Sequence, residues 1–153
     1  AKMSEMSAAM GLLQLHYADH CIKRRLQIAS QYRKALATVD GLSTLKHGDH
    51  VEWNGAYFPV FLDALTRDQR DAVYEAMKRE EVYGRRYFYP LLTDFPMYQD
   101  IPSGAPENLP NARKVADSVI CLPIYPTMTD NDVERVLSAF FSALLEGSRS
   151  RRG

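Results

Sequence analysis

Two adjacent arginines followed by three aromatic residues make the segment of this chain with the clearest capacity for chemistry. Arg85 and Arg86 directly precede Tyr87, Phe88 and Tyr89. A guanidinium group can hold two oxygens of a phosphate or diphosphate, while a neighbouring ring stacks on a base or a sugar. The same pattern is also typical of a plain strand that buries its aromatic residues and leaves its arginines in solvent. The pattern alone leaves both interpretations open.

Alternation along a strand predicts how these side chains divide between two faces. Arg85, Tyr87 and Tyr89 would share one face, and Arg86 and Phe88 the other. Phenylalanine is the most apolar of the aromatic residues here, so we expect Phe88 to point into the core. The face with Arg85 would then meet a ligand cleft. A bulge or a slip by one residue would give Arg86 the role of Arg85.

The histidines offer a weaker candidate, a metal site on a helix. His16 and His20 have the i, i+4 spacing that can bind a metal ion on one helical face, and Asp19 lies beside them. No H-E-x-x-H pattern and no third ligand accompany them, although His47 and His50 follow in a nearby loop. We therefore interpret His16 and His20 as surface or interface residues and predict no metal site.

Length and composition indicate one soluble globular domain. The chain of 153 residues is 46% hydrophobic and 25% charged, and its formal net charge is zero, which gives no reason to expect nucleic-acid binding. No apolar run could span a bilayer, and the N-terminus lacks the pattern of a signal peptide. Cys21 and Cys121 show no metal or redox spacing, so we expect free thiols and a cytoplasmic protein that does not bind membranes.

A long helix, predicted from about Met3 to Val39, is the first of the elements that must position these residues. Its apolar residues recur mostly at steps of three and four, Ser4 is a plausible N-cap and Gly41 a plausible stop. A helix of that length measures on the order of 50 Å, longer than a small domain is wide. We expect it to overhang the domain and bury its apolar stripe against something else. The alternative is a break near Gly11.

Strand and helix patterns alternate through the middle of the chain. Residues 51–62 are predicted as a strand, with Pro59 at a sheet edge or a bulge because proline cannot donate to a ladder. Thr66 and Gln69 make a capping box for a helix that runs to about residue 80. The residues of this helix predicted to face inward are Ala72, Val73, Ala76 and Met77. Residues 82–89 are predicted as a second strand.

The last part of the chain is expected to contain a loop, two helices and a strand. Residues 91–108 are predicted as an irregular loop with at most one short turn of helix. Pro110 suits the first turn of a helix over 110–117, and a short strand follows over 119–124. Thr129 is expected to cap a final helix that ends at Gly147. The predicted buried face of that helix consists of Val133, Val136, Leu137, Phe140, Phe141 and Leu144.

The order of these elements predicts an α/β fold, a small sheet with helices on one face. We expect a long interdomain or dimer-facing helix over residues 1–40, a small α/β domain over 41–147, and a disordered basic tail over 148–153.

Three blocks of sequence, taken in order, resemble one family. Residues 2–15 read KMSEMSAAMGLLQL, residues 85–98 read RRYFYPLLTDFPMY, and residues 108–130 read NLPNARKVADSVICLPIYPTMTD. They resemble the C-terminal third of the DegT/StrS-type sugar aminotransferases, and the resemblance runs from about Lys2 to Glu146. These are fold-type I enzymes that use pyridoxal phosphate (PLP). The resemblance implies the small C-terminal domain of that fold, preceded by its long connecting helix.

The resemblance also implies a function for the complete protein. It would transfer an amino group from glutamate to a nucleotide-linked keto sugar, with 4-keto-6-deoxy sugars favoured, and would act as a homodimer. In many relatives a His-Tyr-Pro run lies beside the sugar, and here it reads Phe88-Tyr89-Pro90, which suggests a different sugar. The implied substrate-binding residues are Arg85, Tyr87 and Tyr89. Lys2 matches a basic position near the cofactor phosphate.

The resemblance further implies that catalysis needs residues outside this chain. The family's Schiff-base lysine lies upstream of the KMSE block, and the six lysines here match non-catalytic parts of the family. We therefore expect no catalytic residue in this chain, no activity by the chain alone, and PLP bound mainly by an N-terminal part. Two alternatives stay open: a PLP- or PMP-dependent sugar dehydratase, or a non-catalytic interaction module. A lysine in upstream sequence would separate the enzymes from the module.

Overall fold

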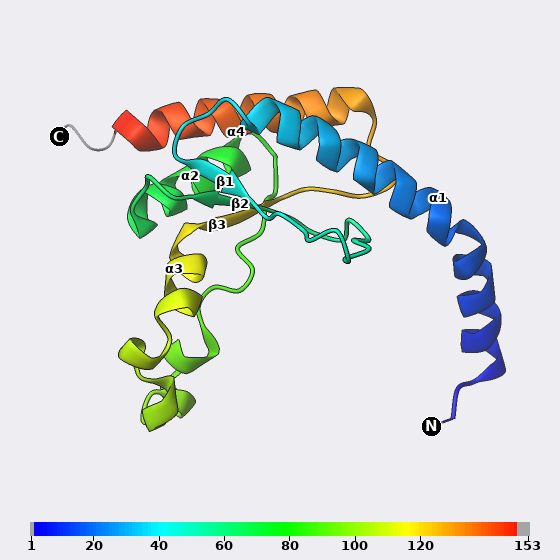
Figure 1. Ribbon diagram of the computed structural model, residues 1–153, viewed down its shortest axis with the longest axis horizontal. Helices are drawn as coiled ribbons and strands as arrows, with labels where there is room; N and C mark the ends of the chain where they lie inside the picture. Colours follow the sequence, from blue (N-terminus) through cyan, green and yellow to red (C-terminus); the bar gives the residue numbers. More distant parts are fainter. Residues whose placement is uncertain (1, 150–153) are drawn as a thin grey trace.

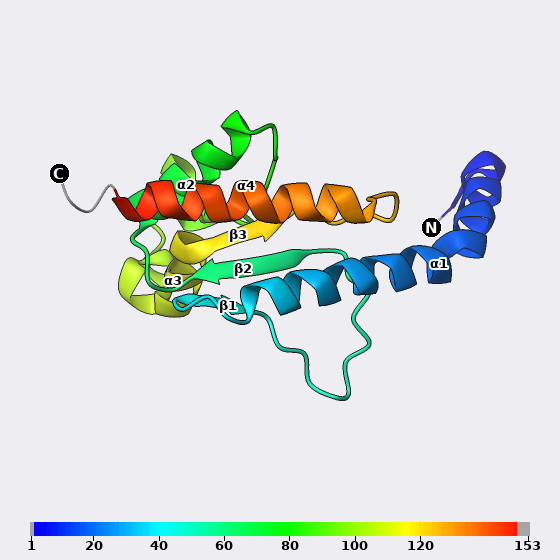
Figure 2. The same ribbon diagram turned by 90° about the horizontal axis from the view of Figure 1, so that it is seen from above.

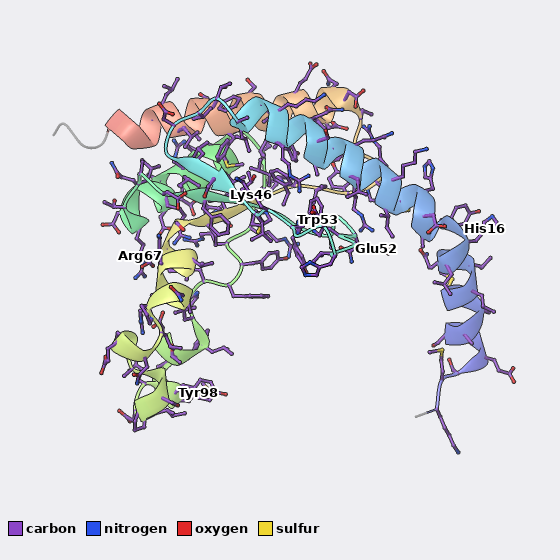
Figure 3. The ribbon with its side chains drawn as sticks, viewed as in Figure 1. His16, Lys46, Glu52, Trp53, Arg67 and Tyr98 are labelled. Carbon is purple, nitrogen blue, oxygen red and sulfur yellow. The ribbon has the colours of Figure 1, made fainter. Side chains whose placement is uncertain are left out.

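A single long helix begins the structure. The computed structural model describes residues 2–149, and helix α1 runs from Glu5 to Leu36 without a break at Gly11. The Oγ of Ser4 accepts a hydrogen bond from the backbone N–H of Ser7 at 3.2 Å, which satisfies a free donor in the first turn. The helix changes direction near His16, well past Gly11 (Figure 3). The prediction of one continuous helix is confirmed.

Only the C-terminal half of α1 packs on the rest of the chain. Its buried residues are Ile28, Ala29, Tyr32 and Leu36. The N-terminal half extends away from the body (Figure 1), and its large apolar side chains are exposed. These exposed residues are Met3, Met6, Met10, Leu12, Leu13, Leu15 and Tyr17. The expected overhang is therefore present, with an apolar stripe that the domain's own core leaves uncovered.

The sheet has three antiparallel strands in the order β1-β2-β3. Strand β1 covers Leu42–Thr44, β2 covers Phe58–Leu62 and β3 covers Val119–Leu122. The strand predicted over 51–62 is thus confirmed for its second part, and the strand predicted over 119–124 for its first part. Strand β1 was not predicted, because three residues are too few to show a period of two. It pairs with the second half of β2, where Thr44 lies opposite Val60.

Pro59 occupies the central strand, so the prediction of an edge or a bulge is wrong. It lies opposite Cys121 of β3, and the N–H and C=O of Cys121 both bond to Arg85 on the far side. Pro59 and Cys121 are therefore a pair that exchanges no hydrogen bonds. On the other side of β2, the pairing with β1 ends at Thr44 opposite Val60, so Pro59 has no partner in β1. No strand needs the missing N–H, which is why a proline is tolerated here.

Three further helices complete the fold, and their ends follow the capping signals in the sequence. Helix α2 covers Arg67–Arg79 and has the predicted capping box between Thr66 and Gln69. Helix α3 covers Pro110–Ser118, with its proline in the first turn. Helix α4 covers Asp130–Arg149, and Thr129 and Asp132 exchange hydrogen bonds at its start. One inward residue of α2 was predicted wrongly: Ala72 is exposed.

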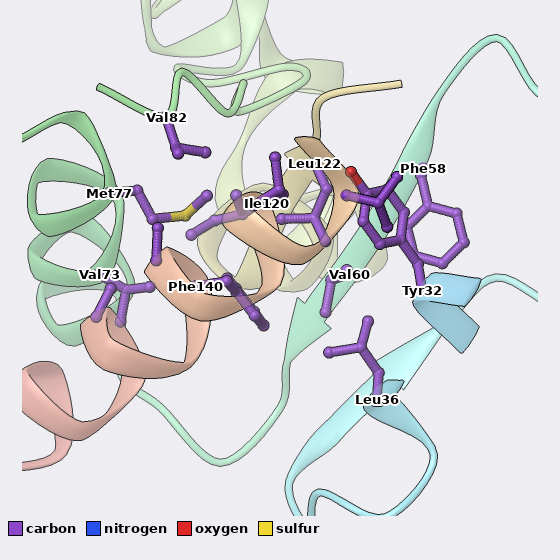
Figure 4. Packing of buried hydrophobic residues seen from close by; sticks show 14 of the residues in the cluster. Tyr32, Leu36, Phe58, Val60, Val73, Met77, Val82, Ile120, Leu122 and Phe140 are labelled. Carbon is purple, nitrogen blue, oxygen red and sulfur yellow. The ribbon is translucent and has the colours of Figure 1, made fainter. Parts of the chain in front are cut away.

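The core lies between one face of the sheet and three helices. In Figures 1 and 2 the C-terminal half of α1, α2 and α4 lie over the sheet, while α3 lies below it in Figure 1. Phe58, Val60 and Leu62 of β2 point into the same cluster as Phe140 and Met77 (Figure 4). The predicted face of α4 faces this cluster, with its members buried or partly buried. The predicted α/β class is confirmed, and α1, α2 and α4 form the expected helical layer on one face of the sheet, with α3 outside that layer.

Residues 82–108 depart most from the prediction. The second strand predicted over 82–89 is reduced to one bridge between Arg85 and Cys121. The region predicted as a loop with one short turn contains four 3-10 helices, each of three residues. They are η1 (Leu92–Asp94), η2 (Pro96–Tyr98), η3 (Pro102–Gly104) and η4 (Pro106–Asn108). Three of them start at a proline, whose fixed φ suits a first helical position.

Helix α4 does not end at Gly147, as the sequence predicted, but continues to Arg149. Gly147 is buried, and a Cβ placed on it would lie 2.8 Å from Cγ2 of Val73 and 3.3 Å from the carbonyl oxygen of Gln69. The glycine therefore lets α4 approach α2 closely. The first two residues of the predicted tail, 148 and 149, belong to α4, and residues 150–153 lie outside the described residues.

The first prediction concerns this contact. Gly147→Ala should lower the free energy of unfolding by about 1 kcal/mol, because overpacking against buried Val73 outweighs the better helix propensity of alanine. Gly11→Ala is the matched control, since a Cβ there meets nothing within 4 Å, and it should be neutral or slightly stabilising. Urea unfolding midpoints measure both changes. Equal stabilisation by the two variants would contradict the proposed close contact.

Candidate functional site

The arginine-aromatic segment is held to the sheet at one point and then turns away. The backbone N–H of Arg85 donates to the carbonyl of Cys121 at 2.9 Å, and the N–H of Cys121 donates back at 2.7 Å. Four residues later the N–H of Tyr89 donates to the carbonyl of Arg86, which closes a turn. Strand alternation therefore stops at Arg85, and the expected sharing of faces does not extend to Tyr89.

Arg85 and Tyr87 lie together, as predicted. Nη1 of Arg85 donates a hydrogen bond to the hydroxyl oxygen of Tyr87 at 2.7 Å. The ring of Tyr57 meets the ring of Tyr87 edge-on, with 5.0 Å between centroids. These three side chains, with Tyr83 and Tyr125, line a pocket of about 310 Å³. An arginine and four phenols offer donors and ring edges suited to a phosphorylated sugar.

Cys121 forms part of the same pocket wall. Its thiol is only 7% exposed, and burial raises its pKa. A raised thiol pKa keeps the sulfur protonated near neutral pH, where a thiol is a poor nucleophile. Cys121 is therefore a structural wall residue. Both Cys21 and Cys121 are free thiols, as expected.

Tyr89 lies apart from Arg85 and Tyr87, on the side of α2. Its hydroxyl oxygen accepts a hydrogen bond from Arg67. The guanidinium carbons of Arg67, Arg70 and Arg86 lie 4.8, 4.7 and 4.8 Å from the centre of its ring. Three cations around one ring are a strong set of cation–π contacts. The predicted trio of substrate residues is thus divided into a pair and a separate tyrosine.

Arg70 organises this second group and was missed by the sequence prediction. Its side chain is fully buried, and Nη1 donates to the carbonyls of Ala116 at 2.8 Å and Val119 at 3.1 Å. Its Nε lies 2.8 Å from Oδ1 of Asp71, and the same oxygen accepts a bond from Arg86 at 2.7 Å. Burial lowers the pKa of Arg70, and the charge of Asp71 opposes that effect.

A signal for Arg70 was present in the sequence. It precedes Val73 and Met77 at helical spacings of three and seven, which places it on the buried face of α2. An arginine at a core position needs carbonyl or carboxylate partners. Those partners come from the junction of α3 and β3, which local patterns do not identify.

Phe88 points outward, so its predicted burial is wrong. Its side chain is 75% exposed, because it sits in the turn that follows Arg86. With Tyr87, Tyr89 and Leu92 it borders a second, mainly apolar pocket of about 790 Å³. Tyr87 borders both pockets. Phe88 is therefore exposed at the rim of this mainly apolar pocket.

The residues expected elsewhere do not form a site within the described chain. Lys2 is exposed and precedes α1, and α1 begins far from the body in Figure 1. His16 and His20 are exposed on α1, and His47 stacks on Trp53. Among residues 2–149 no three His, Cys, Asp or Glu side chains gather in a way that could hold a metal ion. The same residues include no helix long and apolar enough to cross a membrane.

Comparison with solved structures defines the class of the fold. The chain superposes on DesI, solved in the presence of its TDP-sugar product, with a TM-score of 0.83 and 32% identity, over 99% of this chain and 38% of that one. Among sequences it is 38% identical over 135 residues to dTDP-4-amino-4,6-dideoxy-D-glucose transaminase of Escherichia coli, 88% of this chain and 36% of that protein.

The family follows from a match along nearly the whole chain. Residues 1–141 match the model of the DegT/DnrJ/EryC1/StrS aminotransferase family, and the chain belongs to this family. A further relative is dTDP-4-dehydro-2,3,6-trideoxy-D-glucose 4-aminotransferase of Saccharopolyspora spinosa, 32% identical over 92% of this chain and 34% of that protein. The chain spans about a third of the length of the curated relatives it matches.

The second prediction tests the buried arginine network. Asp71→Asn removes the carboxylate shared by Arg70 and Arg86, and it should cost about 3 kcal/mol of unfolding free energy because it leaves a buried cation without its counter-charge. Glu146→Gln breaks the exposed ion pair with Arg79 and should cost at most about 1 kcal/mol. Denaturant titration of both variants measures the difference. Similar small losses would show that Asp71 does not hold the network.

Proposed function

We propose that this chain is the C-terminal portion of a PLP-dependent enzyme that transfers an amino group from glutamate to a nucleotide-linked keto sugar. The observation that carries the proposal is the family match over residues 1–141. The 38% identical relative is named as a dTDP-4-amino-4,6-dideoxy-D-glucose transaminase, and this favours a 4-keto-6-deoxy sugar. That similarity covers about a third of the relative's length, so the activity belongs to the proposed complete protein.

The role of this chain in the proposed reaction is to bind and orient the nucleotide sugar. Arg85 would hold diphosphate oxygens through its guanidinium edge, and Tyr87 would reach a sugar hydroxyl or stack on the ring. The hydrogen bond between them fixes both side chains before the ligand arrives, which reduces the entropy lost on binding. The edge-on contact with the ring of Tyr57 further restricts the position of Tyr87.

We further propose that Tyr89 contacts the substrate from the neighbouring apolar pocket, which it borders together with Tyr87. Arg67 holds the Tyr89 hydroxyl and three guanidinium groups lie around the ring, so contact would come from the part of the ring that borders this pocket. The exposed Phe88 would present an apolar ring where many relatives place a histidine, and it would select against a sugar that needs a polar partner there.

We propose that this chain does not form the PLP site by itself. Within residues 2–147 Lys78 pairs with Glu75, and Lys2 is exposed on a separate part of the fold. We propose that PLP, which supplies an electron sink for amino transfer, is bound mainly by an N-terminal part, with Lys2 near its phosphate. The exposed apolar stripe of α1 is suited to a homodimer contact. Two free thiols suit a cytoplasmic protein.

The third prediction tests the role of Arg85. In the complete enzyme, Arg85→Ala should raise KM for the nucleotide sugar by roughly 10- to 100-fold, because a charged hydrogen bond to the diphosphate is lost. KM for glutamate should change little, since glutamate carries no diphosphate. Steady-state kinetics with each substrate varied in turn measures both constants.

Arg86→Ala is the matched control for this experiment. Its guanidinium is already paired with Asp71 at 2.7 Å, so its loss should reduce stability and affect both substrates alike. If Arg85→Ala also raised both KM values equally, Arg85 would have a folding role and would no longer be assigned to the proposed site.

A further inference from the structure

A second polar pocket lies on another part of the molecule. It has a volume of about 850 Å³ and is bordered by the end of α1, the strand β1 and the loop that follows β1. Figure 3 shows Lys46 and Trp53 along that loop, beneath α1. None of its lining residues borders the Arg85 pocket or the apolar pocket beside Phe88. It is therefore a separate cavity, within the 300–1,000 Å³ typical of small-molecule sites.

The charged side chains that line this pocket are cationic. Arg33 and Lys46 line it, with His47 beside them, and no aspartate or glutamate is among the lining residues. Within residues 2–147 neither Arg33 nor Lys46 makes a side-chain hydrogen bond or an ion pair. Other arginines of the chain do find carboxylates, as Arg24 does with Asp130 at 2.9 Å. Two cations facing one cavity without an anion are a ready complement for an anionic ligand.

Stacking on Trp53 holds Arg33 and His47 in place. The guanidinium carbon of Arg33 lies 4.8 Å from the ring centre of Trp53 and 5.8 Å from that of Phe58. The ring of His47 stacks on Trp53 with 4.6 Å between centroids and 25° between planes. A stacked guanidinium keeps its N–H donors free along its edge. Arg33 is thus fixed in position while its donors stay open to an oxyanion.

From these contacts we propose that this pocket binds a small phosphorylated molecule. Arg33 and Lys46 hold its phosphate oxygens, and His47 contributes a further donor at the rim. Leu36 and Leu42 line the same pocket and receive the apolar part of the ligand. The proposal concerns residues that have no part in the nucleotide-sugar site, so it stands or falls independently of the proposed function.

The fourth prediction uses a reporter that the sequence provides. Trp53 is the one tryptophan of the chain, so its fluorescence reports on this pocket alone. Inorganic pyrophosphate, added at constant ionic strength, should change the emission with a saturable curve. Lys46→Gln should weaken binding by about tenfold or more, because a charged hydrogen bond is lost. Lys34→Gln removes the same charge from an exposed position next to Arg33 in sequence, and it should bind as the unmodified chain does.

Arg33→Gln is measured by equilibrium dialysis of pyrophosphate as well as by fluorescence, because it also changes the stack on Trp53. Circular dichroism checks that each variant is folded. Loss of pyrophosphate binding in the folded Arg33→Gln variant supports the proposed site. An emission change that does not saturate, or that sodium chloride reproduces at equal ionic strength, overturns the proposal. Unchanged binding in folded Lys46→Gln overturns it too.

Discussion

The burial of one arginine, Arg70, connects the parts of this structure that the proposed site depends on. Its guanidinium bonds to carbonyls at the end of α3 and in β3, pairs with Asp71, and faces the ring of Tyr89. A cation out of water is unfavourable unless such partners surround it. The same contacts therefore determine where α2, the junction of α3 and β3, and the segment after Arg85 lie relative to one another.

This arrangement divides the arginines into two groups with different roles. Arg70 and Arg86 are committed to Asp71 and hold the chain together. Arg85 and Arg33 have no carboxylate partner within residues 2–147 and border separate cavities. Residues 85 and 86 are neighbours in the sequence, yet the structure shows that Arg86 is paired with Asp71 while Arg85 bonds to the Tyr87 hydroxyl. A chain of zero net charge can in this way present, within its described residues, two pockets that are each lined by an arginine without a carboxylate partner.

The long helix, the capped helices and the α/β class could be predicted from local patterns, because periodicity and capping residues act over a few positions. Lys2, Arg85, Tyr87 and Tyr89 as binding residues remain predictions. The outward turn of Phe88 could not be predicted, since it depends on Arg85 meeting Cys121 from 36 positions away. The position of Pro59 was predicted wrongly for a similar reason. A proline is tolerated in the central strand only because neither adjacent strand accepts a hydrogen bond at that position. Gly147 was read as a helix stop, although its role is contact with α2.

Hydrogen exchange in an Arg70→Met variant tests most directly the claim that Arg70 positions the site segment. Methionine fills much of the same volume without the donors. The account predicts faster exchange of the amides of Arg85, Tyr89 and Cys121, and unchanged protection in the middle of α4. Arg79→Met, which alters an exposed arginine of the same helix, should leave all of these amides as they were. Unchanged exchange at Arg85 and Tyr89 in Arg70→Met would contradict the account.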